Sequence, residues 1–266
     1  MTLVHGNPGS KKITNHYKSK LKKYKIERKL LNMETGFTSF RKELSSLISL
    51  YKILKQKKPN ILHTISPKAN LYGGLLSLLF KVQLVISVSG LGSLYNPRFQ
   101  YLNLIYNFLF KIIFLKKNIN IIFHNKSDLN YYKKRFKLNQ NQLFLTHGSG
   151  VDLKKYKYNY NYKKKNILFA GRMLKSKGVL DFIAASISLQ KDLPDWKFLI
   201  AGTTDYKNPD SINLKEIKNK IKNFKNIKYL GYQKNNVKMF RNIGIYCLPS
   251  YSEGLSKTLL EASATG

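Results

Sequence analysis

Cysteine is nearly absent from this sequence, whose 266 residues include only Cys247. A single cysteine excludes a disulfide-stapled scaffold and is typical of a protein of the reducing cytosol. Cys247 lies in the apolar run 243–248, so we expect a buried, unreactive thiol. Apolar residues are not scarce, because 43% of the chain is hydrophobic. That content excludes a mostly disordered chain, and the length favours two folded domains.

Acidic residues are scarce as well: 13 stand against 48 lysines and arginines, a formal net charge of +35. This excess favours an anionic partner such as nucleic acid, an anionic lipid surface or a phosphorylated substrate. Only six of the 48 cations are arginine, and lysine, asparagine, isoleucine and tyrosine are all abundant. A+T-rich codons produce the same bias without selection for binding. The charge leaves both origins open, and an anionic membrane surface is the partner we favour.

An uninterrupted apolar run that could span a membrane is missing too. The strongest segment, 101–123, contains Lys111, Lys116 and Lys117, so it falls short of the ~20 apolar residues that a span needs. We read it as a helix over 99–115 followed by a strand, and such a lysine-flanked helix is suited to lie on a membrane surface. Residues 1–9 lack the pattern of a signal peptide. We expect a cytoplasmic protein, peripheral at the inner face of the cytoplasmic membrane.

Short apolar runs alternate with longer helix-like stretches along the whole chain. The expected strands are 2–5, 60–64, 83–88, 120–123, 143–145, 166–170, 197–201, 227–230 and 243–248. The expected helices are 10–23, 39–57, 69–80, 99–115, 126–136, 178–190, 211–224, 234–241 and 256–265. This alternation indicates parallel βαβ units, and strands that are apolar along their length indicate sheets covered on both faces. The fold class is therefore α/β.

A polar segment rich in lysine, tyrosine and asparagine breaks this alternation in the middle of the chain. We therefore place an N-terminal domain at 1–150, a linker at 151–165 and a C-terminal domain at 166–266. Interleaved lysines and tyrosines also resemble a nucleic-acid contact, where aromatic rings stack on bases. A solvated linker is the interpretation that we favour.

Residues 166–178 combine a strand, a glycine and several cations. The strand ends at Ala170, Gly171 is expected to permit a tight turn, and Arg172 and Lys177 then lie in the loop that opens the helix at 178–190. Such loops bind ligands in parallel sheets, and a helix N-terminus favours an anion. Arginine holds two phosphate oxygens at once and lysine supplies a point charge. The loop is a candidate diphosphate clamp, with scattered surface charge as the alternative.

Residues 247–266 bring two of the scarce acids to the start of the last expected helix. Glu253 precedes this helix and Glu261 lies two turns into it, so both can face one ligand over the helix start. Carboxylates accept hydrogen bonds from sugar and ribose hydroxyls. The alternative is one acid favoured by the helix dipole and one unrelated surface glutamate.

Taken together, the two segments resemble the retaining glycosyltransferases of the GT-B fold, family 4. The shared patterns are Ala-Gly-Arg-x-x-x-x-Lys-Gly at 170–178 and Pro-Ser-x-x-Glu-Gly-x-x-x-x-x-x-Glu-Ala at 249–262. Residues 61–64, 67–69, 89–92, 123–128 and 146–152 are similar to further stretches of the family. The branch that the chain resembles most makes capsule, O-antigen or lipid-linked oligosaccharides. The resemblance implies a hexosyltransferase-type enzyme with two Rossmann-like domains facing a cleft.

The resemblance also implies which residues act on the donor, expected to be a UDP-sugar. Arg172 and Lys177 match the residues that hold the diphosphate and neutralise its charge as it leaves, and Gly171 belongs to the same loop. The family retains the configuration of the sugar and uses no metal. The acceptor is expected to be a lipid-linked or saccharide hydroxyl.

The remaining donor contacts come from the C-terminal motif and from one loop of the first domain. Glu261 matches the carboxylate on the nucleotide ribose, and Glu253 matches a contact to the donor sugar. Three residues contribute backbone N–H groups to the same sugar: Gly254, Leu255 and Ser256. Gly90 lies in the loop that resembles the family's cleft loop. Ser89 stands where many relatives carry histidine, so no catalytic histidine is assigned.

Both ends of the sequence depart from the family pattern. The chain begins at what looks like the family's second strand and stops near the helix that carries Glu261. We therefore expect both domains to be incomplete. Two alternatives stay open: a basic nucleic-acid-binding protein, and an inactive truncated remnant of a glycosyltransferase.

Overall fold

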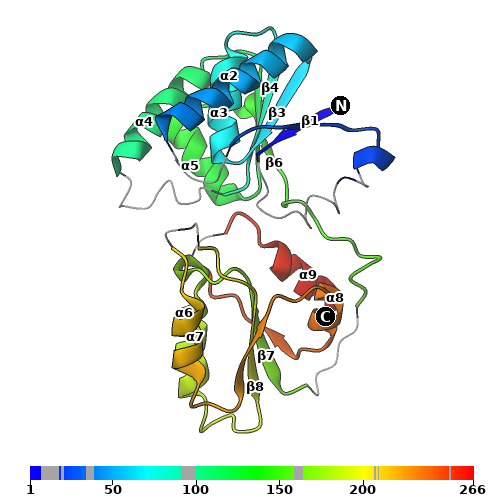
Figure 1. Cartoon of the computed structure of the whole chain (residues 1–266), viewed down its shortest axis with the longest axis vertical. Helices are drawn as coiled ribbons and strands as arrows, with labels where there is room; N and C mark the ends of the chain where they lie inside the picture. Colours follow the sequence, from blue (N-terminus) through cyan, green and yellow to red (C-terminus); the bar gives the residue numbers. More distant parts are fainter. Residues whose placement is uncertain are drawn as a thin grey trace. The chain divides into compact units, whose positions relative to one another are not determined.

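The computed structural model of the chain describes residues 1–6, 18, 21–33, 39–90, 100–158, 164–206, 208, 210–251 and 253–266. They form two compact units (Figure 1). The first unit contains residues 1–88, 93–122 and 133–144, and the second contains 89–92, 123–132 and 145–266. Strands pair in parallel in both units, so the predicted α/β class with parallel sheets is confirmed.

The first unit is built on a four-stranded sheet in the order β3-β4-β5-β6. Its strands are β3 (Ile61–Ile65), β4 (Gln83–Val88), β5 (Ile119–Phe123) and β6 (Leu143–Leu145). Helix α2 (Phe40–Lys57) precedes β3, and the helices between the strands are α3 (Pro67–Ser77), α4 (Gln100–Ile113) and α5 (Lys126–Phe136), of which residues 126–132 belong to the second unit. Leu84, Ile86 and Phe110 are fully buried. Burial of these aliphatic and aromatic side chains between sheet and helices stabilises the unit.

A strand that the sequence did not predict, β2 (Glu27–Leu30), pairs in parallel with β1 (Thr2–His5). Among the described residues these two strands form a sheet of their own. The run Glu-Arg-Lys-Leu lacks the apolar character on which strand prediction relies, so it was missed. The carboxylate of Glu27 lies 2.6 Å from Lys57 Nζ at the end of α2. This pairing lowers the pKa of Glu27 to about 2.

The second unit contains a sheet in the order β10-β7-β8-β9. Its strands are β7 (Asn166–Ala170), β8 (Lys197–Ala201), β9 (Ile227–Gly231) and β10 (Ile245–Tyr246). The helices are α6 (Val179–Ser188), α7 (Leu214–Ile221), α8 (Asn236–Arg241) and α9 (Lys257–Thr265). Figure 1 shows α6 and α7 on one side of this sheet and α8 and α9 on the other. A buried apolar cluster fills each side, so the predicted two-sided cover is confirmed here.

Several predicted boundaries shift by a few residues. Helix α3 begins earlier than predicted because Pro67 occupies its first turn, where the missing N–H has no cost. Helix α7 and strand β10 are shorter than the predicted 211–224 and 243–248. The predicted helix 10–23 falls mostly outside the described residues, although residues 18 and 21–23 are helical.

Two expectations about burial are modified. Tyr156, in the predicted solvated linker, is 4% exposed and packs against Phe240 of α8. That part of the segment therefore belongs to the core of the second unit. Cys247 is half-buried against the core, and burial raises the pKa of its thiol, as an unreactive cysteine requires.

We expect Phe198→Ala to lower the free energy of unfolding by about 3–5 kcal/mol, because it removes a large core side chain. Phe198 lies in β8 and is 1% exposed. Urea unfolding followed by circular dichroism measures the change. Tyr232→Ala, at a position that is 74% exposed, is the control and should change the value by less than about 0.5 kcal/mol. Equal losses in both variants would contradict the placement of Phe198 in the core.

Candidate functional site

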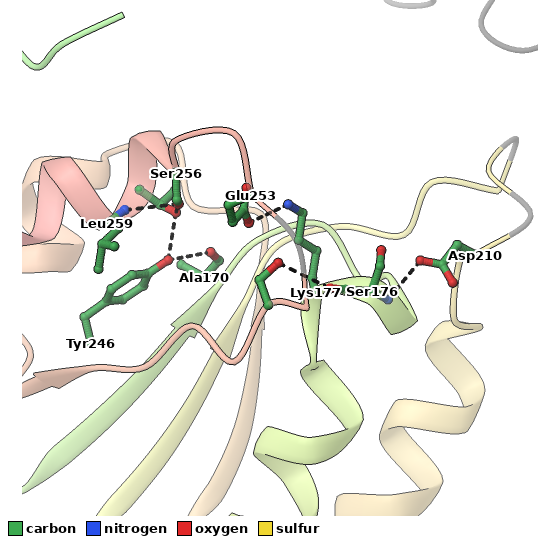
Figure 2. A network of polar contacts seen from close by, with 10 residues as sticks. Ala170, Ser176, Lys177, Asp210, Tyr246, Glu253, Ser256 and Leu259 are labelled. Carbon is green, nitrogen blue, oxygen red and sulfur yellow. Dashed lines mark hydrogen bonds and ion pairs between the residues drawn. The ribbon is translucent and has the colours of Figure 1, made fainter. Parts of the chain in front are cut away.

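Two loops distant in sequence meet at the carboxyl ends of β7 and β10. The first loop forms a short 3-10 helix, η4 (Lys175–Lys177), and the second carries Glu253. The Nζ atom of Lys177 lies 2.5 Å from Oε1 of Glu253 (Figure 2). Both side chains are partly exposed, at 20% and 29%. The ion pair therefore lies at the surface of the sheet's carboxyl edge, where α/β proteins bind ligands.

Backbone contacts hold the same two loops together. Gly178 has a φ of 72°, and a Cβ atom there would overlap the carbonyl oxygen of Pro249. Only glycine suits this conformation and this close approach. The carbonyl oxygen of Ser176 accepts hydrogen bonds from Tyr251 N–H at 3.0 Å and from Ser250 Oγ at 3.2 Å. The spacing between Lys177 and Glu253 is thus set by the backbone as well as by their charges.

The segment after β8 braces the cationic loop from its other side. The carboxylate of Asp210 accepts a hydrogen bond from Ser176 N–H at 2.9 Å, and its backbone carbonyl accepts one from Lys175 N–H at 3.0 Å. Asp205 Oδ2 lies 3.1 Å from Arg172 Nη1. Sequence reasoning missed both aspartates, because their positions in an irregular loop gave no periodic or motif signal.

A chain of hydroxyl groups connects the end of β7 to the start of α9. The carbonyl of Ala170 can only accept, so the Tyr246 hydroxyl donates to it at 3.0 Å. Thr258 Oγ1, 2.7 Å away, must then donate to Tyr246, and Ser256 Oγ lies 3.0 Å from Thr258 Oγ1. Ser256 also caps α9 by accepting from Leu259 N–H, as Figure 2 shows. These bonds fix where the helix begins relative to the sheet.

Tyr246 is a site residue that the sequence did not reveal. Burial is the main cause that raises the pKa of its phenol to about 12, and the carboxylates of Glu253 and Glu261 contribute. Both acids therefore act electrostatically on one hydroxyl group. Nothing in the apolar run 243–248 distinguished this tyrosine from an ordinary core residue.

Glu253 and Glu261 do not occupy equivalent environments. Glu253 pairs with Lys177 at the surface, whereas Glu261 in α9 is 4% exposed. The carboxylate of Glu261 accepts a hydrogen bond from Asn236 Nδ2 at 3.3 Å and another from the Tyr156 hydroxyl. Burial and this bond raise the pKa of Tyr156 to about 12. The expectation that both acids lie open to one ligand thus fits Glu253 better than Glu261.

The remaining predicted site residues lie as follows. Gly171 directly follows β7, but its φ is not positive and an added Cβ would make only ordinary contacts. The chain bends at Gly171, and this bend does not depend on the conformational freedom of glycine. Gly254 and Leu255 are half-buried just before α9, and Leu255 packs on Gly148. Gly90 follows β4 with a φ of 147°, a conformation that favours glycine.

This arrangement is suited to an anion with several charges. Arg172 is 58% exposed and Lys177 remains partly accessible, and both are neutralised here by carboxylates. Helices α6 and α9 begin beside the two loops, and their N-termini favour negative charge. Among the described residues, no group of three or more histidine, cysteine, aspartate or glutamate side chains could hold a metal ion.

Comparisons with known proteins show which families the chain is similar to. Residues 150–266 match the model of the family "Glycosyl transferases group 1", and residues 7–125 match "Glycosyl transferase 4-like". Each half of the chain is thus similar to a glycosyltransferase family, and the predicted family resemblance is confirmed.

Two curated relatives carry activities in their names. The chain is 30% identical over 241 residues to the N,N'-diacetylbacillosaminyl-diphospho-undecaprenol alpha-1,3-N-acetylgalactosaminyltransferase of Campylobacter jejuni. It is 28% identical over 242 residues to the UDP-Gal:alpha-D-GlcNAc-diphosphoundecaprenol alpha-1,3-galactosyltransferase of Escherichia coli. These matches cover 84% and 86% of this chain. The chain spans 61% of the length of each relative.

Solved structures of the same fold are more distant in sequence. Anabaena HepE in complex with UDP aligns with a TM-score of 0.71 at 14% identity, over 94% of this chain and 68% of that one. A glycosyltransferase from Rickettsia africae aligns with a TM-score of 0.66 at 17% identity, over 99% of this chain and 69% of that one. The GT-B glycosyltransferase fold class is thereby confirmed.

We expect Asp210→Ala to speed amide hydrogen exchange at Ser176 by at least tenfold, because it removes a charge-assisted acceptor worth about 1.5–3 kcal/mol. Hydrogen exchange with mass spectrometry of a peptide over 173–178 measures the effect. Asp192→Ala, on the exposed turn before β8, is the matched control. An unchanged exchange rate in Asp210→Ala would show that Asp210 does not brace η4.

We expect Tyr246→Phe to lower the free energy of unfolding by about 1–2 kcal/mol near pH 8, through the loss of its hydrogen bonds. The folded pKa of Tyr246, about 12, lies above the usual phenol value of 10.0. The contribution of the hydroxyl is therefore complete below pH 10 and is lost as pH rises through 12. Urea unfolding at pH 8 and pH 11 should show a smaller difference from wild type at the higher pH. A pH-independent difference, or an equal effect in Tyr232→Phe, would refute this assignment.

Proposed function

We propose that this protein transfers a hexose from a nucleotide-diphosphate donor, a UDP-sugar, to a lipid-linked or saccharide acceptor in surface polysaccharide synthesis. The observation that carries this proposal is the position of Arg172 and Lys177 on one loop, with Lys177 paired to Glu253. This loop lies at the carboxyl edge of a parallel sheet and leads directly into α6. Such an edge is a general binding site for nucleotide phosphates.

In the proposed complex, the donor diphosphate replaces Asp205 at Arg172 and binds Lys177 beside Glu253. In the structure, Arg172 contacts Asp205 and Lys177 contacts Glu253. The guanidinium group can take two phosphate oxygens, and the ammonium group has three protons, so it can keep Glu253 while binding phosphate. Asp205 and Glu253 thus position the two cations for the phosphate groups.

The proposed chemistry needs charge stabilisation more than proton transfer from the protein. The bond between the sugar C1 and the β-phosphate oxygen breaks, and the acceptor oxygen bonds to C1 on the same face, so the configuration is retained. The acceptor proton passes to the departing phosphate oxygen. Arg172 and Lys177 stabilise the negative charge that develops on that phosphate. Glu253 and the N–H groups before α9 orient the donor sugar.

Glu261 is assigned to the nucleotide ribose in this proposal. Its carboxylate is buried beside Asn236 and Tyr156, so ribose binding requires one of these two hydrogen-bond partners to move. The names of both curated relatives specify acceptors on an undecaprenyl diphosphate. By analogy we propose a polyprenyl-linked acceptor and action at an anionic membrane surface on the cytoplasmic side.

Incubation of the full chain with UDP-sugars and an undecaprenyl-diphosphate-linked sugar tests the proposal directly. We expect a product elongated by one hexose unit, and NMR of its anomeric proton should report retention. Inversion would contradict the proposed front-face mechanism. Binding of UDP without turnover would favour an inactive remnant, and absence of both would overturn the proposed function.

We expect Arg172→Ala and Lys177→Ala each to weaken UDP binding by about 10–100-fold, because each removes a charge-assisted contact to phosphate. Isothermal titration calorimetry measures the affinity. Lys191→Gln removes a charge from an exposed position after α6 and is the control. A loss in the control equal to that in the two site variants would mean that net charge alone drives binding.

We expect Glu253→Gln to separate binding from turnover. The change removes the carboxylate that lies 2.5 Å from Lys177, so UDP should bind a few-fold more tightly. Sugar transfer should fall at least tenfold, because the amide no longer orients both Lys177 and the donor sugar. Weaker UDP binding together with unchanged turnover would contradict this role.

The nucleic-acid alternative stays a prediction from the net charge of +35. Binding to DNA or RNA should weaken steeply as salt rises, because phosphate contacts release counterions. Donor binding that depends on Arg172 and Lys177 distinguishes the enzyme from that alternative.

A further inference from the structure

An exposed apolar stripe runs along α4 in the first unit. Leu104 and Phe108, both 63% exposed, lie one turn apart on α4, and Leu115, 80% exposed, lies in the turn just after this helix; we call these three residues the α4 stripe. Lys111 follows Phe108 on the same side of the helix. Phe110, on the side of α4 that faces the core, is fully buried. Apolar side chains are therefore exposed on a helix whose core-facing side is already complete.

A second stripe with the same design lies on α2. Its members, 36–74% exposed, are Phe40, Leu44, Ile48 and Tyr51, and we call them the α2 stripe. Lys55 continues the same helical line one turn further. Each stripe thus has a lysine on the same side of its helix as the exposed apolar side chains.

Helix α3 contacts both α2 and α4, so the helices that carry the two stripes are neighbours of the same helix. The ring of Tyr51 lies 5.5 Å from that of Phe80, in the turn after α3. Just after α4, Lys116 Nζ donates a hydrogen bond to the carbonyl oxygen of Ser77, at the end of α3, at 2.8 Å. Leu79, which lies beside Phe80 in the turn after α3, is 68% exposed. The α2 and α4 stripes therefore end on either side of one apolar turn.

Charge in this part of the chain has a single sign. Residues 39–118 contain twelve lysines and arginines but one acid, Glu43. Glu43 is 6% exposed, lies 2.8 Å from Lys68 Nζ and accepts a hydrogen bond from Tyr72. The outer side of α2, α3 and α4 therefore carries cations and apolar groups with no acid between them.

We propose that the α2 and α4 stripes form a docking face for the surface of an anionic phospholipid bilayer. Apolar side chains enter the acyl boundary while the neighbouring lysines contact the headgroups. A second copy of the chain would bring like charges together, and the exposed side chains are mainly aliphatic rather than the aromatic platforms of nucleic-acid sites. Among the described residues no helix is long and apolar enough to cross a membrane. The proposal rests on the proposed function, because a lipid-linked acceptor lies in such a bilayer.

Co-sedimentation of the full chain with vesicles tests this face. Wild type should bind vesicles of phosphatidylglycerol and phosphatidylcholine, and should bind phosphatidylcholine alone at least tenfold less. Leu104→Gln/Phe108→Gln should weaken binding at least tenfold, because two apolar side chains no longer enter the bilayer. Lys55→Gln/Lys111→Gln should weaken it by roughly 25-fold, at about fivefold per lysine.

Matched controls lie on the second unit. Tyr232→Gln and Lys218→Gln/Lys220→Gln change exposed residues of the same kinds and should bind vesicles like wild type. Urea unfolding checks that every variant is folded. The proposal is overturned if wild type does not bind anionic vesicles, or if the face variants and the controls behave alike. It is also overturned if light scattering shows a dimer that the α4 variant dissociates without any change in vesicle binding.

UDP binding measured on the same variants separates this proposal from the proposed function. The face variants should bind UDP like wild type, because α2 and α4 carry none of the donor residues. Vesicle binding that is intact in a chain unable to bind UDP would refute the donor site alone. UDP binding that is intact in a chain unable to bind vesicles would refute the docking face alone.

Discussion

The ion pair between Lys177 and Glu253 joins two loops that are 76 residues apart in the sequence. Strand β10 pairs with β7, so the loops that follow these strands emerge at the same edge. The close approach of Gly178 to Pro249 leaves little freedom in their separation. The charges of the site are therefore positioned by the order of strands in the sheet, and the ion pair is the point at which both loops meet.

Acids are rare in this chain, and three of those in the second unit lie beside the cationic loop of the site. Asp205 contacts Arg172, Asp210 braces η4, and Glu253 contacts Lys177. In a chain with a net charge of +35, each of the two site cations thus has a carboxylate beside it. A resident carboxylate that an incoming phosphate can replace preorganises the site without closing it.

The two units share parallel α/β construction but differ in how they use charge. The second unit pairs its site cations with acids, whereas the helices α2 to α4 of the first unit expose lysines beside apolar stripes. Paired cations suit a small, multiply charged ligand. Exposed lysines beside apolar side chains suit an extended anionic surface. The same excess of lysine thus has two different structural settings.

The sequence by itself determined the α/β class, most strands and helices, and the two motifs that bring Arg172, Lys177 and Glu253 to one edge. It could do so because apolar runs, their alternation with helices and the short motifs are local patterns. Only the tertiary structure decided that Tyr246 and Asp210 belong to the site, that Glu261 is buried and that Glu27–Leu30 is a strand. These outcomes depend on contacts between residues far apart in the sequence, and no local pattern records such contacts.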